Sequence, residues 1–446
     1  MSAETEFRRI VGSAQVQQRL PAISAAVFRD GEPLWQEALG LANVDRDEPA
    51  TVDHRYRIGS ITKTFTAVAV MQLQEDGALA LEAPIRTVVP EFQPGPTFAQ
   101  ALAHLTGIQR EPAGEIWETM DAPDREQLLA GLEDAEQVLA PGESWHYSNL
   151  AFAVLGEAVV RLSGSYERHL EERILAPLGL HHTALRATEP AATPYYIHPW
   201  TQVAHVEPSF DASESTAAAG WLWSTTGDLA RWGDFLCTGH DDVLPRAVVD
   251  RMCRLETMVD SRSWTRGWGL GLELARLGDR VLVGHGGAMP GFLAALYVDR
   301  ADRTGAVVLT NTTAAASPKT IALDLITAAL DYAPRAPSQW RPSPPPPTEL
   351  EPLLGQWWTE GDELAITWDA PRLRIDVIRG PAGTTSWLER AGDDCWRVSE
   401  GRERGELVRV VRDEHGAPVK LYFATYPVTR APLSFGAEVD ATPRPS

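Results

Sequence analysis

Cysteine is scarce in this sequence, with only Cys237, Cys253 and Cys395 among 446 residues. The three are odd in number and far apart, and they form neither a CxxC motif nor a metal-binding pattern. The simplest setting for such a chain is a reducing compartment.

Two kinds of targeting or membrane segment are also missing from the sequence. Residues 1–9 contain no apolar segment of the kind that a secretory signal needs, and no run of about twenty apolar residues follows. Positive charge is in the minority, because the formal net charge is −21. This excess of acid argues against nucleic acid or an anionic membrane as the main partner. We therefore predict a soluble, cytoplasmic protein.

Lysine is as rare as cysteine, since arginine supplies positive charge almost everywhere and only Lys63, Lys319 and Lys420 occur. Lys63 stands at the start of an apolar run that continues to Gln74, where a charged side chain is costly. Unlike a guanidinium group, an amine can lose its proton in such surroundings. The position of Lys63 therefore indicates a requirement for a neutral amine.

Ser60 and Lys63 are three residues apart in a segment that predicts a turn leading into a helix over about 60–76. At this spacing both side chains project from one face of the helix. A serine hydroxyl is a poor nucleophile at neutral pH, but a buried amine whose pKa falls from about 10.4 to roughly 7–8 can take its proton. Ser-x-x-Lys also occurs by chance, so the pair needs further support.

The second candidate motif is Tyr147-Ser148-Asn149, which ends a loop and begins a predicted helix over 149–163. Tyr147 could carry a proton between Ser60 and a leaving group, and Asn149 could bond to an amide of the substrate. A helix cap is the structural alternative for these residues.

The third candidate motif lies in residues 284–292, where four glycines imply that something approaches the backbone closely. His285 and Gly287 belong to this segment. The backbone N–H groups of Ser60 and Ala288 could form an oxyanion hole. A purely structural histidine is the alternative. Strands are predicted at 268–274 and 280–284 nearby.

Ser-x-x-Lys, Tyr-x-Asn and His-Gly-Gly, in this order, resemble the serine β-lactamase and penicillin-binding-protein superfamily over about residues 7–332. The class C β-lactamase, D,D-peptidase and esterase group is the most similar branch. The resemblance implies an α/β sandwich with an all-helical subdomain and a site between them. It implies an acylated Ser60, Lys63 as its base, Tyr147 as proton relay, Asn149 at the acyl donor, and His285 in place of a lysine. Because histidine is largely neutral at pH 7, it grips a carboxylate less firmly, which argues against antibiotic hydrolysis.

Three segments are predicted along the chain. Residues 1–333 form the serine domain and 334–348 a stiff proline-rich linker. Residues 349–446 contain short strands with hairpin spacing, which predict a small antiparallel β-barrel that resembles a lipocalin-like domain.

This architecture, together with Ala-Ala-Ala-Gly-Trp-Leu-Trp-Ser at 217–224, is similar to the penicillin-binding-protein-type thioesterases. That likeness implies a peptidyl thioester ending in a D-residue, presented by a carrier protein of a peptide synthetase. It also implies head-to-tail macrolactamisation by the peptide's own amine, as in nonribosomal peptide release. Gly220 and Trp221 are expected at the cleft. Arg430 is considered as a contact from the barrel to the substrate, against the alternative of a solvated surface arginine.

Other functions remain open. A cytoplasmic serine esterase or D-amino-acid peptidase would use the same residues, and an acylation-only sensor of β-lactams or peptides would stop at the first step. A metal hydrolase is disfavoured because no HExxH or HxH cluster occurs, and a Ser-His-Asp hydrolase because no GxSxG occurs. We expect no metal and no cofactor.

Overall fold

The computed structural model describes residues 2–93, 95–208, 213–313, 317–337, 339–379, 384–434 and 436. The chain divides into two compact units, Met1–Arg335 and Ala336–Ser446, which we call the serine unit and the barrel unit. Among the described helices, none has the length and apolar character needed to cross a membrane.

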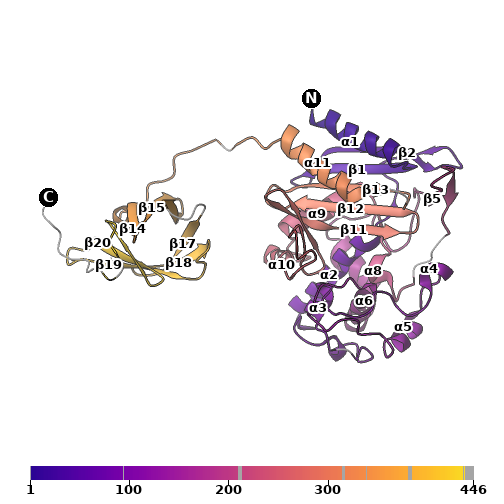
Figure 1. Ribbon diagram of the computed structural model, residues 1–446, viewed down its shortest axis with the longest axis horizontal. Coiled ribbons are helices and arrows are strands. Elements are labelled where there is room, and N and C mark those ends of the chain that lie inside the picture. The colour runs from indigo at the N-terminus through magenta and orange to yellow at the C-terminus, as the bar shows by residue number, and fades with distance from the viewer. Residues whose placement is uncertain are drawn as a thin grey trace. The chain divides into compact units, whose positions relative to one another are not determined.

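The serine unit is built on a nine-stranded antiparallel sheet in the order β3-β2-β1-β13-β12-β11-β10-β9-β8 (Figure 1). β1 pairs with both β2 and β13, so the N-terminal hairpin joins the last strands of the unit. The hairpin turns at Asp30-Gly31, where φ values of 54° and 80° match the turn that suits twisted strands. The strands are β1 Ala22–Arg29, β2 Glu32–Asn43, β3 Glu48–Pro49, β8 Thr257–Met258, β9 Arg266–Trp268, β10 Glu273–Leu277, β11 Arg280–Met289, β12 Phe292–Asp299 and β13 Thr304–Thr310.

Helices cover both faces of this sheet. α1 (Ala3–Gln17) and α11 (Pro318–Tyr332) pack on one face, through Phe7, Val11 and Leu325 among others. α9 (Thr226–Thr238) packs on the other face, beyond which lies a helical region (Figure 1). Because both faces are covered, β1 and β13 are almost wholly buried and apolar.

The helical region is centred on α2 (Thr62–Glu75), whose residues from Thr62 to Leu73 are all buried. α2 ends at Glu75 with Asp76 as its C-cap, and Gly77 follows with a φ of 73°, which is the usual conformation after a helix end. The other helices are α3 Phe98–Leu102, α4 Ile116–Thr119, α5 Arg125–Gly131, α6 Asn149–Ser163, α7 Tyr166–Leu170, α8 Ala217–Gly220 and α10 Arg246–Met252. Two small strand pairs complete the unit: β4 Tyr56–Arg57 with β7 Trp223–Ser224, and β5 Tyr195–Ile197 with β6 Ala204–Val206.

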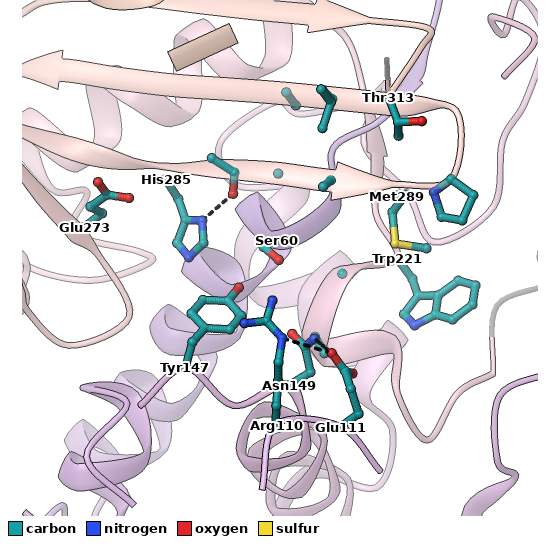
Figure 2. Close-up of a pocket in the computed structure, with 18 of the residues that line it drawn as sticks. Ser60, Arg110, Glu111, Tyr147, Asn149, Trp221, Glu273, His285, Met289 and Thr313 are labelled. Atoms are coloured by element: carbon teal, nitrogen blue, oxygen red, sulfur yellow. Dashed lines mark hydrogen bonds and ion pairs between the residues drawn. The ribbon is translucent and has the colours of Figure 1, made fainter. Parts of the chain in front are cut away.

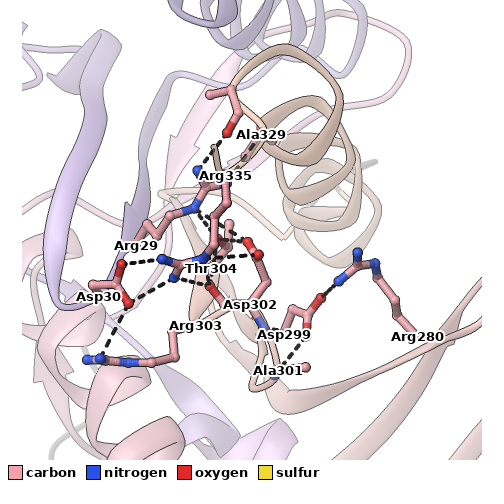
Figure 3. A network of polar contacts seen from close by, with 11 residues as sticks. Arg29, Asp30, Arg280, Asp299, Ala301, Asp302, Arg303, Thr304, Ala329 and Arg335 are labelled. Carbon is pink, nitrogen blue, oxygen red and sulfur yellow. Dashed lines mark hydrogen bonds and ion pairs between the residues drawn. The ribbon is translucent and has the colours of Figure 1, made fainter. Parts of the chain in front are cut away.

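A network of arginine and aspartate side chains joins the turns at one end of the sheet to the last residues of the serine unit (Figure 3). Arg335 contacts Asp30 at 2.8 Å and Asp302 at 3.1 Å. Asp30 also pairs with Arg303, and Asp302 also pairs with Arg29. The chain is therefore held to the sheet up to the residue at which the unit ends.

The barrel unit contains a closed antiparallel barrel of eight strands. Its core includes Trp357, Trp396 and Leu421. The strands are β14 Gly355–Thr359, β15 Asp362–Asp369, β16 Arg372–Arg379, β17 Thr385–Gly392, β18 Cys395–Glu400, β19 Leu407–Arg412, β20 Pro418–Phe423 and β21 Tyr426–Thr429. The predicted fold class, a β-lactamase-like α/β unit followed by an antiparallel barrel, is confirmed.

Two strand predictions near the site need correction. The strand predicted at 268–274 is interrupted, because β9 ends at Trp268 and β10 begins at Glu273. Gly271 between them has a φ of 75°, and a Cβ there would lie 2.3 Å from Ala67 Cβ. The strand predicted at 280–284 continues to Met289. The prediction stopped too early because the glycines after residue 283 hide the apolar alternation that marks a strand.

Candidate active site

Ser60 lies in a 3-10 turn, Gly59–Ile61, that leads directly into α2. We call it the serine turn. β11 runs against it without room for side chains: a Cβ at Gly59 would lie 2.4 Å from Ala288 N, and a Cβ at Gly287 would lie 1.9 Å from Ile58 O. The backbone of Ala288 is therefore adjacent to the serine turn, as an oxyanion hole built from Ser60 N–H and Ala288 N–H requires.

Lys63 is completely buried beneath Ser60. Its Nζ lies 3.2 Å from Ser60 Oγ, 2.7 Å from Asn149 Oδ1 and 2.5 Å from Ala219 O. Burial lowers the pKa of Lys63 to about 7, while the charge of Glu111 opposes this shift. A neutral amine can donate to Asn149 and Ala219 and direct its lone pair at the hydroxyl of Ser60. The geometry thus suits a general base.

Tyr147 lies beside both residues of this pair. Burial raises the pKa of its phenol, and a hydrogen bond with Ser60 acts in the opposite direction. The Lys63 ammonium position is 5.0 Å from the centre of the Tyr147 ring. Tyr147 therefore remains protonated at neutral pH and can pass a proton to a group that leaves from Ser60.

His285 lies on β11 and is buried, with 3% of the residue exposed. Nδ1 bonds to the carbonyl of Gly286, while Nε2 has no hydrogen-bond partner among the described residues. Burial lowers its pKa to about 4, so the ring is neutral at pH 7. In Figure 2 the ring stands above the Tyr147 hydroxyl, on the side away from Trp221.

Asn149 is the first residue of α6, and the helix-cap alternative applies to its neighbour instead. Ser148 Oγ accepts from Ala151 N and caps the helix. The Asn149 side chain turns to the site, where Oδ1 accepts from Lys63 and Nδ2 donates to Glu111 Oε1 at 2.7 Å.

These residues share one pocket of about 880 Å³. Most of the predicted site residues line it: Ser60, Tyr147, Asn149, Gly220, Trp221, His285, Gly287 and Ala288. Lys63 lies behind the pocket wall. On one side of Ser60 the lining is apolar, with Ile116, Trp117, Trp221, Met289 and Pro290. Figure 2 shows the Trp221 ring next to the Met289 thioether.

Five charged lining residues were not predicted. Arg110 and Glu111 lie in the loop after α3, and the Arg110 guanidinium stands 5.0 Å from the centre of the Tyr147 ring. Arg266 and Glu273 are paired on β9 and β10, and Lys319 adds a second contact to Glu273 at 2.5 Å. No motif marks these residues, since they come from separate loops, strands and a helix that meet only in the folded chain. Among the described residues, no group of three or more metal-binding side chains was found.

Arg430 makes its contacts within the barrel unit. Its Cζ lies 3.7 Å from the centre of the Trp357 ring, and its Nη1 donates to the carbonyls of Leu354 and Gln356 at 3.2 and 2.9 Å. These contacts hold the guanidinium against the barrel unit, while the residue remains exposed. A contact of Arg430 with the substrate stays a prediction.

The chain belongs to the β-lactamase family, within the β-lactamase and penicillin-binding-protein superfamily. The family model described as Beta-lactamase matches residues 7–331. Residues 346–430 match a domain of unknown function, DUF7586.

Three relatives illustrate the range of the similarity. Esterase EstB of Burkholderia gladioli is 29% identical over 356 residues, which cover 69% of this chain and 90% of EstB. The structure of SurE is 25% identical with a TM-score of 0.60 and covers 96% of this chain and 99% of SurE; a structure of SurE with D-Leu aligns with a TM-score of 0.59. A D-stereospecific amidohydrolase from Streptomyces sp. is 26% identical with a TM-score of 0.62, over 75% of this chain and 99% of the amidohydrolase. Family and relatives together identify an enzyme of the serine hydrolase type.

Proposed function

We propose that the chain accepts a peptidyl thioester or ester with a C-terminal D-residue, forms an acyl-enzyme on Ser60 and releases the peptide by head-to-tail macrolactamisation. The observation that carries the acyl-enzyme step is the buried Lys63, 3.2 Å from Ser60 Oγ with a pKa of about 7. The D-residue is supported by the Streptomyces amidohydrolase and by the SurE structure with D-Leu.

In the first step Ser60 Oγ attacks the thioester carbonyl carbon while its proton passes to Lys63 Nζ. The negative charge on the carbonyl oxygen is directed at the N–H groups of Ser60 and Ala288. The carbon–sulfur bond then breaks, and the thiolate takes a proton through Tyr147. The result is a free thiol and an ester on Ser60.

In the second step the amino nitrogen of the peptide attacks the Ser60 ester and loses one proton to the site. Ser60 Oγ leaves, regains a proton and is ready for another cycle. Ring closure needs a folded-back chain and little water at the ester. The apolar pocket side at Trp117, Trp221 and Met289 supports both requirements. SurE aligns over 96% of the chain, the barrel unit included.

A carrier protein of a peptide synthetase is the proposed donor of the thioester. We assign the reaction to the cytoplasm, where such carriers work.

Hydrolysis is the second candidate function. EstB and the D-stereospecific amidohydrolase carry names of hydrolytic enzymes, and water could replace the amine in the second step. A sensor that forms a stable acyl-enzyme uses the first step alone.

Product mass separates these functions. The purified protein is mixed with a linear peptidyl thioester, made once with a D- and once with an L-residue at its C-terminus. We expect a product lighter by the thiol, without added water, from the D-peptide alone. Free acid would contradict cyclisation and favour the hydrolase, and a persistent adduct on Ser60 would favour the sensor. Turnover by a Ser60→Ala variant would contradict the acyl-enzyme altogether.

A further inference from the structure

The backbone of residues 109–111 is pinned to the start of α6. The N–H groups of Asn149 and Leu150 donate to Arg110 O at 2.7 and 3.1 Å, and Gln109 N–H donates to Glu136 O at 2.9 Å. These bonds hold Glu111 beside Asn149. The position of Glu111 in the site is therefore fixed by the backbone hydrogen bonds of its segment.

The two carboxylate oxygens of Glu111 have different surroundings. Oε1 accepts from Asn149 Nδ2 at 2.7 Å and lies 3.3 Å from Arg110 Nε. For Oε2, no hydrogen bond occurs within the described part of the chain, and the side chain, 28% exposed, lines the pocket. In Figure 2 the Glu111 carboxylate stands between Asn149 and Trp221. One oxygen thus has acceptor capacity left for a ligand.

The other carboxylate that lines the described pocket does not have this capacity. Glu273 is 4% exposed in its side chain and bonds to Arg266 at 2.8 Å and to Lys319 at 2.5 Å. Its two cationic partners hold the pKa of its carboxyl down despite burial. Among the described residues, Glu111 forms an ion pair with Arg110, whose side chain is itself 62% exposed.

We propose that Glu111 binds a primary ammonium group of the substrate through Oε2. The proposal rests on the function proposed above and adds the requirement for a free amine near Ser60. A charged N–H···O bond in a partly desolvated pocket is stronger than a neutral one and selects cationic ligands. The amine could be the α-ammonium of a single D-aminoacyl donor, or the free N-terminus of a longer peptide that returns for ring closure.

Binding to a Ser60→Ala protein tests the proposal without turnover. By calorimetry at pH 6.5, where an α-amine is protonated, D-leucinamide is compared with N-acetyl-D-leucinamide. In a second arm, a linear octapeptide amide ending in a D-residue is compared with its N-acetyl form. We expect the free amine to bind at least tenfold more tightly in one arm, and that arm identifies the source of the amine.

The charge of Glu111 is tested by adding Glu111→Gln to the Ser60→Ala protein. Glutamine keeps an oxygen that can accept from Asn149 but loses the charge, so the preference for the free amine should disappear. Glu115→Gln is the matched control, because Glu115 is an exposed acid on the same loop outside the pocket; it should leave the preference intact. Equal binding of free and acetylated ligands, no binding in either arm, or a preference that survives Glu111→Gln would overturn the proposal. The mass experiment on the wild-type protein tests the acyl-enzyme separately.

Discussion

At the scale of single residues, the chemistry depends on a lysine that the fold deprives of water. Lys63 Nζ has three oxygen atoms within 3.2 Å, and the residue has no exposed surface. The desolvation cost falls on the charged form alone, so the neutral amine is populated near pH 7. Burial of Lys63 destabilises its charged form, and for that reason the amine can act as a base near neutral pH.

The first prediction concerns pH. Lys63 must be neutral to accept the Ser60 proton, so kcat/KM for an N-acetylated D-aminoacyl thioester should rise with pH through an apparent pKa near 7. His285, with a pKa of about 4, is neutral throughout this range and should not contribute. The rate of thiol release between pH 5 and 9 measures the profile, with the hydrolysis of the thioester in buffer subtracted. A profile that is flat from pH 6 to 8 would contradict Lys63 as the base.

The second prediction concerns the hydroxyl of Tyr147. Tyr147→Phe keeps the ring against Lys63 and removes the proton relay, so we expect thiol release to slow by about 10²–10⁴-fold. Tyr166→Phe is the control, because it removes a buried hydroxyl bonded to Thr66 Oγ1 at 2.7 Å outside the pocket. A loss of the same size in both variants would indicate that structure, and not proton transfer, is affected.

At the scale of elements, the site depends on how closely β11 approaches the serine turn. The absence of side chains at Gly59 and Gly287 lets the two backbones meet. β11 thereby brings His285 and Ala288 to Ser60, while α6 brings Asn149 from the opposite side. The glycines at 59 and 287 thus set the position of β11 against Ser60, and the start of α6 sets the position of Asn149.

The third prediction tests this approach by stability. Gly287→Ala places a Cβ 1.9 Å from Ile58 O, which is backbone and cannot move alone. We expect the free energy of unfolding of the serine unit to fall by about 1–3 kcal/mol or more. Gly286→Ala is the matched variant on the next residue, where the nearest atom, Ala294 O, would be 3.9 Å away; its unfolding should change by less than about 1 kcal/mol. Calorimetric unfolding compares the two. Equal losses would show that strand flexibility, and not close contact, explains the glycines.

Elements also explain what the sequence could predict. Ser60 and Lys63 lie on one helix, and Tyr147 and Asn149 lie at one helix start, so local spacing and a resemblance suffice to propose them. Glu111 and the group of Arg266, Glu273 and Lys319 face one pocket only because the fold brings the loop after α3 to the same pocket as β9, β10 and α11. The break between β9 and β10 depends on the contact of Gly271 with Ala67. Such long-range contacts leave no periodic pattern in the sequence.

At the scale of the whole molecule, the chain contains two units with separate cores. Two apolar clusters lie within Met1–Arg335, and the cluster around Trp357 lies within the barrel unit. The members of each cluster come from one unit only. Separate cores predict separate unfolding transitions, since burial within a unit is the main source of its stability.

The last prediction uses a tryptophan from the barrel core. Trp357 is fully buried, donates from Nε1 to Leu353 O at 2.7 Å and lies beneath the Arg430 guanidinium. Trp357→Ala should destabilise the barrel unit by about 3–5 kcal/mol, because it leaves a cavity in the core and removes the ring on which the Arg430 guanidinium stacks. Trp340→Ala is the control, since that side chain is 83% exposed and should cost less than about 0.5 kcal/mol. We expect scanning calorimetry to show two transitions and only the barrel's transition to shift in Trp357→Ala. If both transitions shift together, the two units unfold as one, and the stability of the serine site depends on the barrel.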